Sequence, residues 1–420
     1  MKTKFAALAI AFALACVPTR ALAANGTIQT QPTWWDFQSI DTMKYSRDPS
    51  GQFLSDLPSL RTLAQTQISN IAKAGANYVA IATPYDDQFL PVLEVWVQTA
   101  RANNLHVWFR GNWSGWEGWF GYPKITRQQH IDKTVTFIKD HADLFEDGDV
   151  FSACPECENG GPGDPRLNGD MQGHRKFLID EHAAMAEALR GIDRNVQINF
   201  NSMNGDVAKL IMDQATTQAL GGIVVIDHYV KSPEELSVDV TDIAKRSGGK
   251  VVLGEFGAPI PDIHGQMTED QQASWIRDAL RLLSANPDLY GVNYWTSVGG
   301  STAIWNNDYS PKLAVQAVKR YFSPQLIKVA VSNSLGQHLN DAIIQTPAKT
   351  FSGTRGTVTF ASLDSQDIVK VSAPGYIEQQ FVTQNLAKNP TVSLLPVKIS
   401  PWYSFFLWLK SIWVALFGRL

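Results

Sequence analysis

Lys250-Val-Val-Leu-Gly-Glu255-Phe-Gly-Ala-Pro259 is the stretch of sequence that decides the fold. Its short apolar run, rich in β-branched residues, predicts a buried strand that ends at Gly254. Glu255 would then place a carboxylate just beyond the buried strand, outside the apolar core. One acid at one strand end is weak evidence for an active site. A second acid at the end of another strand of the same sheet would make the two a candidate catalytic pair.

The chain around this stretch alternates short apolar runs with longer amphipathic ones, from Trp34 to about Tyr321. This pattern is typical of parallel strands joined by helices. Eight such units in roughly 290 residues match a (β/α)₈ TIM barrel, an α/β fold of about 250 residues. A doubly wound sheet is the alternative, but no glycine-rich phosphate loop follows the first strand. The strands are expected near residues 37–43, 78–82, 106–110, 150–154, 196–200, 222–226, 251–254 and 291–295.

The N-terminal residues have the pattern of a secretory signal peptide. A basic start is followed by an apolar run and by Ala21-Leu22-Ala23, so we expect residues 1–23 to be removed and the barrel to occupy 24–324. The protein would then be exported, to the periplasm or the cell surface. Removal of Cys16 would leave only Cys154 and Cys157, too few for disulfides to be the framework of the fold.

Residues 325–398 lose the helical pattern and become rich in Thr, Ser, Val and Gly, which predicts a small all-β sandwich. Three segments, Asn333-Ser-Leu-Gly-Gln337, Gly356-Thr-Val-Thr-Phe360 and Val371-Ser-Ala-Pro-Gly-Tyr376, resemble the carboxypeptidase-regulatory-like sandwich of exported proteins. That resemblance implies a spacer or binding accessory and not a catalytic unit.

The final segment, 401–420, is dominated by aromatic and aliphatic residues. About twenty such residues can span a bilayer core, so a hydrophobic membrane-anchor helix is expected. Lys410 near the middle would cost about 2.5–3.5 kcal/mol, which the apolar residues can offset. A narrow polar stripe of Ser404, Ser411 and Gly418 leaves a helix lying in the membrane interface as the alternative.

The second carboxylate follows the fourth predicted strand, in Cys154-Pro-Glu156-Cys-Glu158-Asn159. Barrel enzymes carry their chemistry at the carboxyl ends of the strands, where Glu255 also lies. Two carboxyls facing each other suit cleavage of a glycosidic bond: one protonates the leaving oxygen and the other attacks the anomeric carbon. A retaining enzyme needs them about 5–5.5 Å apart and an inverting one roughly 6.5–9.5 Å.

The acid after strand four, Gly254-Glu255-Phe-Gly257 after strand seven and Trp295 after strand eight together resemble a clan A glycoside hydrolase, closest to family 5. The resemblance implies a retaining mechanism with Glu255 as nucleophile and a strand-four Glu as acid/base. Pro155 stands where the clan has an Asn that holds the sugar 2-hydroxyl. We prefer Glu156 as the acid because it directly follows the strand; Glu158 would then bind substrate or support its neighbour.

Other side chains at the same strand ends are candidates for binding the carbohydrate substrate. In similar enzymes a Tyr such as Tyr229 donates to the nucleophile, and a Trp such as Trp295 floors the reactive subsite. A structural role at the barrel end is the alternative for each. The further candidates are His228, Arg110, Asn112, Arg47, Asp48, Asn199 and Asn201, with at least one of Trp113, Trp116 and Trp119 as a subsite wall.

The remaining functional classes are less favoured by the sequence. A net charge of −4 gives no reason to expect a nucleic-acid partner. No cofactor is expected, and two cysteines with no nearby His make a poor zinc site, so no metal is expected either. Cys154-Pro-Glu-Cys157 is a C-x-x-C motif, but the residues after it do not start a helix, which disfavours thiol–disulfide catalysis. A barrel that binds carbohydrate without cleaving it stays open, because the Asn before Glu156 is missing.

Overall fold

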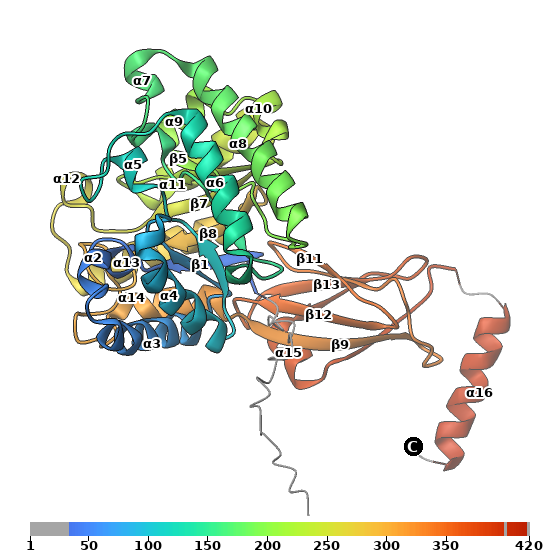
Figure 1. Ribbon diagram of the computed structural model, residues 1–420. Coiled ribbons are helices and arrows are strands. Elements are labelled where there is room, and N and C mark those ends of the chain that lie inside the picture. Colours follow the sequence, from blue (N-terminus) through green and yellow to red (C-terminus); the bar gives the residue numbers. More distant parts are fainter. Residues whose placement is uncertain (1–32, 399–400, 418–420) are drawn as a thin grey trace, which may run out of the picture.

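The computed structural model describes residues 33–398 and 401–417 of the 420-residue chain (Figure 1). The predicted signal peptide therefore lies outside the described residues. The first part of the described chain is an eight-stranded parallel sheet in the order β4-β3-β2-β1-β8-β7-β6-β5. Its strands are β1 Phe37–Asp41, β2 Tyr78–Ile81, β3 His106–Phe109, β4 Val150–Phe151, β5 Ser202–Asn204, β6 Ile223–Asp227, β7 Lys250–Phe256 and β8 Leu289–Tyr294.

The sheet curls until its two edge strands meet. Val150 of β4 forms a parallel bridge with Gln197, just ahead of β5, and this contact closes the barrel. The fifth strand is a correction to the sequence prediction, which placed it at 196–200. Because β4 offers only two residues to a neighbour, the 196–200 segment makes one bridge there. The regular ladder begins at Ser202, where β6 supplies a longer partner.

Helices lie between successive strands and cover the outside of the barrel (Figure 1). Their ends follow local signals: the side chains of Thr126 and Thr268 form capping boxes at the starts of α6 and α13, and α11 ends at Gly248 in a left-handed conformation. The helices are α1 Met43–Ser46, α2 Ser50–Phe53, α3 Leu57–Lys73, α4 Leu90–Ala102, α5 Ser114–Glu117, α6 Arg127–Asp140, α7 Pro165–Asn168, α8 Met171–Gly191, α9 Gly205–Ile211, α10 Gln214–Ala219, α11 Pro233–Ser247, α12 Pro261–His264, α13 Glu269–Ser284 and α14 Leu313–Phe322, with 3₁₀ turns η1 Asp87–Phe89, η2 Ala142–Leu144 and η3 Cys157–Asn159.

The interior of the barrel changes from apolar to charged along its axis. Phe37, Tyr78, Trp108 and Phe200 pack against one another near the amino ends of the strands, with Phe37 4.6–5.4 Å from the other three rings. The next inward-facing layer toward the carboxyl ends is ionisable and contains Glu255. The structure thus confirms the predicted (β/α)₈ barrel and places a charged layer above a dry aromatic one.

A smaller all-β unit follows the barrel, as predicted. It has a four-stranded sheet, β11-β10-β13-β14, and a three-stranded sheet, β12-β9-β15. Both sheets contribute to one apolar core, so they form a sandwich. The elements are β9 Gln325–Asn333, β10 Ile343–Gln345, β11 Thr350–Ser352, β12 Thr357–Ser362, β13 Ile368–Ser372, β14 Gln379–Val382, α15 Thr383–Lys388 and β15 Thr391–Leu394. Its resemblance to the carboxypeptidase-regulatory-like sandwich stays a prediction.

The sandwich contacts the end of the barrel opposite the carboxyl ends of the strands. The Lys349 ammonium donates to the backbone oxygen of Trp34, which directly precedes β1, and lies 5.3 Å from its ring. The sandwich therefore has no side chain in the charged layer around Glu255.

Helix α16, Pro401–Phe417, follows the sandwich and lies beyond its far end (Figure 1), where the Lys410 ammonium donates to the backbone oxygen of Ser334. Several of its large side chains are exposed, among them Trp402 at 72% and Trp408 at 57%. Within residues 33–398 and 401–417, no helix combines the length and the apolar character needed to cross a membrane, so the expected spanning helix is not seen there.

Candidate active site

Glu255 lies at the carboxyl end of β7, where the register between β6 and β7 shifts. Ile226 pairs with Leu253, but Asp227 pairs with Glu255, so two carboxylates lie side by side at adjacent strand ends. Gly254 occupies the bulge between them. A Cβ at Gly254 would lie 2.4 Å from Oδ1 of Asp227, a distance that real side chains do not tolerate. The glycine is needed because Asp227 occupies that space.

Arg110, directly after β3, is the centre of the charged layer. Its Nη1 lies 2.5 Å from Oε1 of Glu255 and 3.2 Å from Oδ2 of Asp41, and its Nη2 lies 2.5 Å from Oδ2 of Asp227. Burial acts to lower the pKa of Arg110, but the charges of Asp227, Glu255 and Asp41 outweigh it and raise the pKa. One permanent cation therefore joins three buried carboxyl groups.

The carboxyls around Arg110 are not all easily ionised. Burial raises the pKa of Asp41 and raises that of Asp227 well above the ordinary value, while Arg110 opposes both shifts. The charge of Glu255 adds to both increases. Asn293 on β8 donates to Oδ2 of Asp41 at 3.2 Å and to the backbone oxygen of Gly254 at 2.8 Å, and so ties the layer to β8.

Tyr229 holds the second oxygen of Glu255. Its hydroxyl donates to Oε2 at 2.7 Å, so the predicted contact between these residues is present. Burial, followed by the charge of Glu255, raises the pKa of Tyr229 well above its ordinary value, which keeps the phenol protonated as a donor. With Arg110 on Oε1 and Tyr229 on Oε2, the orientation of the Glu255 carboxylate is determined from both sides.

Glu156 follows β4 and is half-buried. Its backbone is left-handed, with φ 48°, and its N–H donates to the oxygen of Ser202 at 2.7 Å. Its Oε2 accepts from Nδ2 of Asn159 at 3.1 Å. Burial and then the charge of Glu255 raise its pKa to about 7, against the lowering effect of Arg110. Glu156 can therefore hold a proton that an ordinary glutamate would lose.

Glu156 and Arg110 open onto a shared cavity at the mouth of the barrel. Its volume is about 140 Å³. The guanidinium of Arg110 reaches from this cavity to Oε1 of Glu255, so the two candidate catalytic carboxyls lie at one site. The cavity is lined by Met43, Arg47, Arg110, Glu117, Trp119, Pro155, Glu156 and Asn159.

Glu158 is placed differently from Glu156. It is buried, and its Oε1 accepts from the backbone N–H of Asn204 at 2.7 Å and from Nδ2 of Asn204 at 2.9 Å. Burial raises its pKa, and these hydrogen bonds oppose the increase. Glu158 thus binds the end of β5 to the loop after β4 and does not line the cavity. The cavity is thus lined by Glu156 and not by Glu158, but β4 ends at Phe151, so Glu156 does not directly follow the strand as the sequence argument assumed. The choice of Glu156 as the acid stays a prediction.

Three predicted substrate-binding residues point elsewhere. His228 donates its backbone N–H to the oxygen of Glu255, but its ring pairs with Asp239 on α11 at 2.7 Å. Asn199 donates to the oxygen of Gly221, ahead of β6, and so lies toward the opposite end of the barrel. Asn201 is buried ahead of β5 and does not line the cavity. Asn199 and Asn201 were predicted to bind substrate because the fifth strand was placed at 196–200. Since β5 begins at Ser202, neither residue lies at the carboxyl end of a strand.

The Trp-rich loop contributes one ring to the cavity and two to the core. Trp113 and Trp116 are buried, and their indole N–H groups donate to Thr134 and to the backbone of Cys157. Trp113 therefore does not line the cavity of Glu156; it lines a separate cavity of about 420 Å³, and its role in substrate binding stays a prediction. Trp119 lines the cavity, with the guanidinium of Arg47 5.1 Å from its ring.

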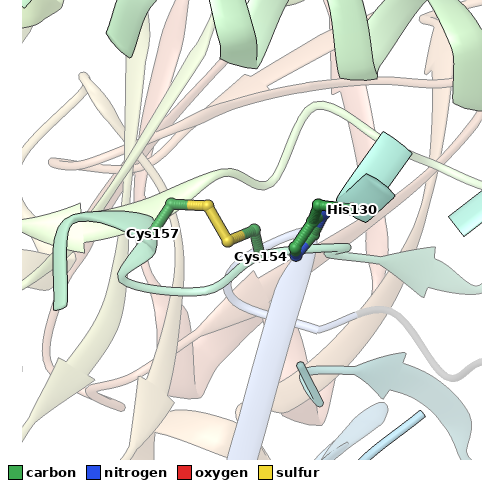
Figure 2. Close-up of side chains that lie close together, drawn as sticks. All are labelled: His130, Cys154 and Cys157. Atoms are coloured by element: carbon green, nitrogen blue, oxygen red, sulfur yellow. A yellow bond between two sulfur atoms is a disulfide. The ribbon is translucent and has the colours of Figure 1, made fainter. Parts of the chain in front are cut away.

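Asn112 is a further correction, because its side chain belongs to a buried network. Its Nδ2 donates to Oε1 of Glu117 at 2.6 Å, and its Oδ1 lies 3.0 Å from Nε2 of His130. His130 lies beside the Cys154–Cys157 disulfide (Figure 2). The expectation of no His near the cysteines is therefore wrong, since α6 brings His130 there. The two sulfurs are bonded to each other, which removes them as metal ligands. The sequence leaves open a structural disulfide or two free thiols for this pair, and the structure has the disulfide.

Trp295 directly follows β8 and is half-buried. Its ring is 5.9 Å from that of Tyr229 in an edge-on arrangement, and the Lys44 ammonium lies 5.5 Å from its centroid. The peptide bond to Thr296 is cis. The Trp295 ring thus contacts Tyr229, which in turn contacts Glu255. Arg47 and Asp48 pair with each other at 2.9 Å at the rim, and Arg47 also lines the cavity.

Sequence reasoning missed Asp41, Asp227 and Glu117 as parts of the site. Asp41 ends β1 and Asp227 ends β6, so the rule that selected Glu255 could have selected both. Glu117 lies within the Trp-rich loop, where no strand end marks it. Arg110 was selected as a substrate-binding residue, whereas its contacts are with the three acids.

No protein-family model matches the chain, and no curated protein matches it. Solved structures with similarity include a Bacteroides uniformis β-glucuronidase bound to a cyclophellitol aziridine (10% identity, TM-score 0.45, 80% of this chain and 44% of that one). A Ruminococcus gnavus β-glucuronidase (14%, 0.42, 62% and 46%) and an Eisenbergiella tayi β-galacturonidase (14%, 0.43, 62% and 48%) are others. The chain spans less than half the length of these proteins. Similarity this low carries no argument about its chemistry, and the resemblance to family 5 stays a prediction.

Proposed function

We propose that the protein is a glycoside hydrolase that cleaves a poly- or oligosaccharide by a retaining double displacement. The observation that carries the proposal is the difference between its two carboxyls. Glu255 is oriented by Arg110 and Tyr229, and Glu156, at the same site, has its pKa raised to about 7. A carboxyl oriented by two donors, beside a second carboxyl that can keep its proton, suits the separate roles of nucleophile and acid.

In the first step, a carboxylate oxygen of Glu255 attacks the anomeric carbon as the bond to the leaving oxygen breaks. Glu156 gives its proton to that oxygen. In the second step, ionised Glu156 takes a proton from water, and the water oxygen displaces Glu255 from the sugar. Glu156 becomes less able to hold a proton once Glu255 is esterified, because the negative charge that raises its pKa is gone. The same residue can thus act first as acid and then as base.

The test uses activated aryl β-glycosides of several sugars with the full chain, followed by NMR of the released sugar anomer. Azide added to Glu255→Ala should attack from the opposite face and form the inverted glycosyl azide. Azide added to Glu156→Ala should intercept the glycosyl-enzyme and form the retained one. Glu158→Gln is the matched control and should show neither product. Rescue of the Glu158 variant alone would move the acid role to Glu158, and an inverted sugar from the wild type would rule out the retaining mechanism.

A barrel that binds carbohydrate without cleaving it is the outcome to exclude. Tight binding of β-glucan, mannan or β-galactan oligosaccharides without turnover, unchanged in Glu255→Ala, would overturn the proposal.

We also infer that the protein is exported after loss of residues 1–23 and that residues 401–420 hold it at a membrane. The division into 24–324, 325–398 and 401–420 is part of this proposal. Support comes from the sequence pattern of the first segment and from the exposed aromatic residues of α16. The full chain should fractionate with membranes and need detergent for extraction, whereas a chain ending at Val397 should not. Equal extraction of both in buffer would contradict the anchor.

A further inference from the structure

Glu117, at the end of α5, is the second carboxyl that lines the cavity and has no role so far. It lines the same cavity of about 140 Å³ as Glu156. Two carboxyls in so small a space oppose each other's ionisation, because each anion raises the free energy of the other. Glu117 can therefore influence the candidate acid without touching the substrate.

A buried network holds Glu117 in this position. The N–H of Trp113 donates to Oδ1 of Asn112 at 2.8 Å, which determines the orientation of the amide. Nδ2 of Asn112 must then be the donor to Oε1 of Glu117, at 2.6 Å. Since Oδ1 can only accept, Nε2 of His130 is a donor, and the opposite ring nitrogen shares one proton with Glu181 at 2.5 Å. Each donor in this side-chain network therefore has an acceptor.

Around both Glu117 and Glu156, some groups raise the pKa of the carboxyl and others lower it. Burial raises the pKa of Glu117 to about 7, opposed by Asn112, Arg47 and Lys124 and assisted by Glu158. For Glu156, burial and the charges of Glu255, Glu158 and Glu117 raise the pKa, and Arg110 lowers it. Arg110 already contacts the carboxyl groups of Asp41, Asp227 and Glu255, so its charge does not act on Glu156 alone.

We propose that Glu117 is a positioning residue of this site: the Asn112 network holds its carboxyl group in the cavity that Glu156 lines, where the ionised form opposes the ionisation of Glu156 and so adds to the effect of burial and of Glu255. The meaning of this effect for catalysis rests on the proposed function. The coupling between the two carboxyls does not, because it is a property of the folded protein and exists whether or not a sugar is cleaved.

The test is a ¹³C NMR titration of glutamate side-chain carboxyls in the full chain, with signals assigned by the Glu117→Gln and Glu156→Gln variants. In Glu117→Gln, the Glu156 carboxyl should titrate lower by about half a pH unit or more. In Glu156→Gln, the Glu117 carboxyl should also titrate lower, because the coupling free energy between two sites is reciprocal. Glu187→Gln, on the exposed face of α8, is the matched control and should move neither signal.

A Glu156 midpoint that is unchanged in Glu117→Gln would overturn the proposal. If the protein also hydrolyses aryl glycosides, the fall of kcat/KM at high pH should move down with the Glu156 midpoint. A higher KM with an unmoved pH profile would instead make Glu117 a substrate contact. Absence of hydrolysis together with reciprocal shifts would contradict the proposed function and leave the coupling intact.

Discussion

The hydroxyl of Tyr229 donates a 2.7 Å hydrogen bond to Oε2 of Glu255, the oxygen opposite the one that Arg110 contacts. Tyr229→Phe removes this donor and leaves the ring that packs against Trp295. A hydrogen bond to a charged group contributes about 1.5–3 kcal/mol, so the unfolding free energy should fall by up to that amount and kcat/KM should fall roughly 10- to 100-fold. Steady-state kinetics and urea denaturation measure the two effects. Tyr376→Phe, in the sandwich, is the control, and equal kinetics in both variants would contradict the role of Tyr229.

The pH dependence of cleavage should follow Glu156. Its pKa is raised to about 7, and the acid is active only while protonated, so kcat/KM should decline as the pH rises through about 7. The measurement is a pH–rate profile with substrates of different leaving groups. A leaving group that departs without protonation should lose the high-pH decline. A decline that persists for such a substrate would show that another group is titrating.

Arg110→Leu should destabilise the barrel. It leaves Glu255, Asp41 and Asp227 close together without their cation, and breaking a buried ion pair in this way costs about 3–5 kcal/mol. The loss should be smaller at pH 5 than at pH 7.5. The raised pKa values of Asp41 and Asp227 let them gain protons in the folded state as the pH falls. Urea denaturation at both pH values measures the effect, with exposed Arg281→Leu as control. A larger loss at pH 5 would contradict this account.

Substitution of the buried Trp113 and of the cavity-lining Trp119, both in the loop after β3, should have different effects on stability and on KM. Trp113 is buried, so Trp113→Ala should cost about 3–5 kcal/mol of unfolding free energy. Trp119 lines the cavity, so Trp119→Ala should raise KM roughly 10-fold with a much smaller effect on stability. Thermal unfolding and steady-state kinetics of both variants check this contrast. The reverse pattern would place Trp113 at the sugar.

Gly254→Ala should damage the site directly. The added Cβ would lie 2.4 Å from Oδ1 of Asp227 and 2.8 Å from Cγ1 of Val225, so Asp227 must move away from Arg110. Overpacking of this kind costs about 1–3 kcal/mol, and activity should fall at least as steeply. Gly191→Ala is the control, because a Cβ there meets no atom within 4 Å. Calorimetry and kinetics of both variants compare them, and wild-type behaviour of Gly254→Ala would contradict the geometry.

Much of the barrel could be predicted because its strands are apolar runs separated by amphipathic helices. The runs match their positions in the structure except the fourth, which ends at Phe151 and not at 154, and the fifth. There the sequence places a strand at 196–200, but the two-residue β4 cannot pair with so long a segment. Asn199 and Asn201 were assigned to the site only through that misplaced strand. His228 was assigned by its neighbours in sequence, although alternation along the chain turns its ring toward Asp239.

The sequence by itself determined the architecture and the location of the chemistry, because strand order in a barrel brings every strand end to one mouth. It thereby selected Glu255, Glu156 and Tyr229. Only the tertiary structure decided the protonation of Glu156 and Tyr229, since burial and neighbouring charges come from distant segments. Glu255 lies in the stretch 250–259, but the residues that contact its carboxyl come from elsewhere in the chain: Arg110 directly follows β3, and Tyr229 lies in the loop after β6. The raised pKa of Glu156 depends on the folded positions of Glu255, Arg110 and Glu117, which no local pattern specifies.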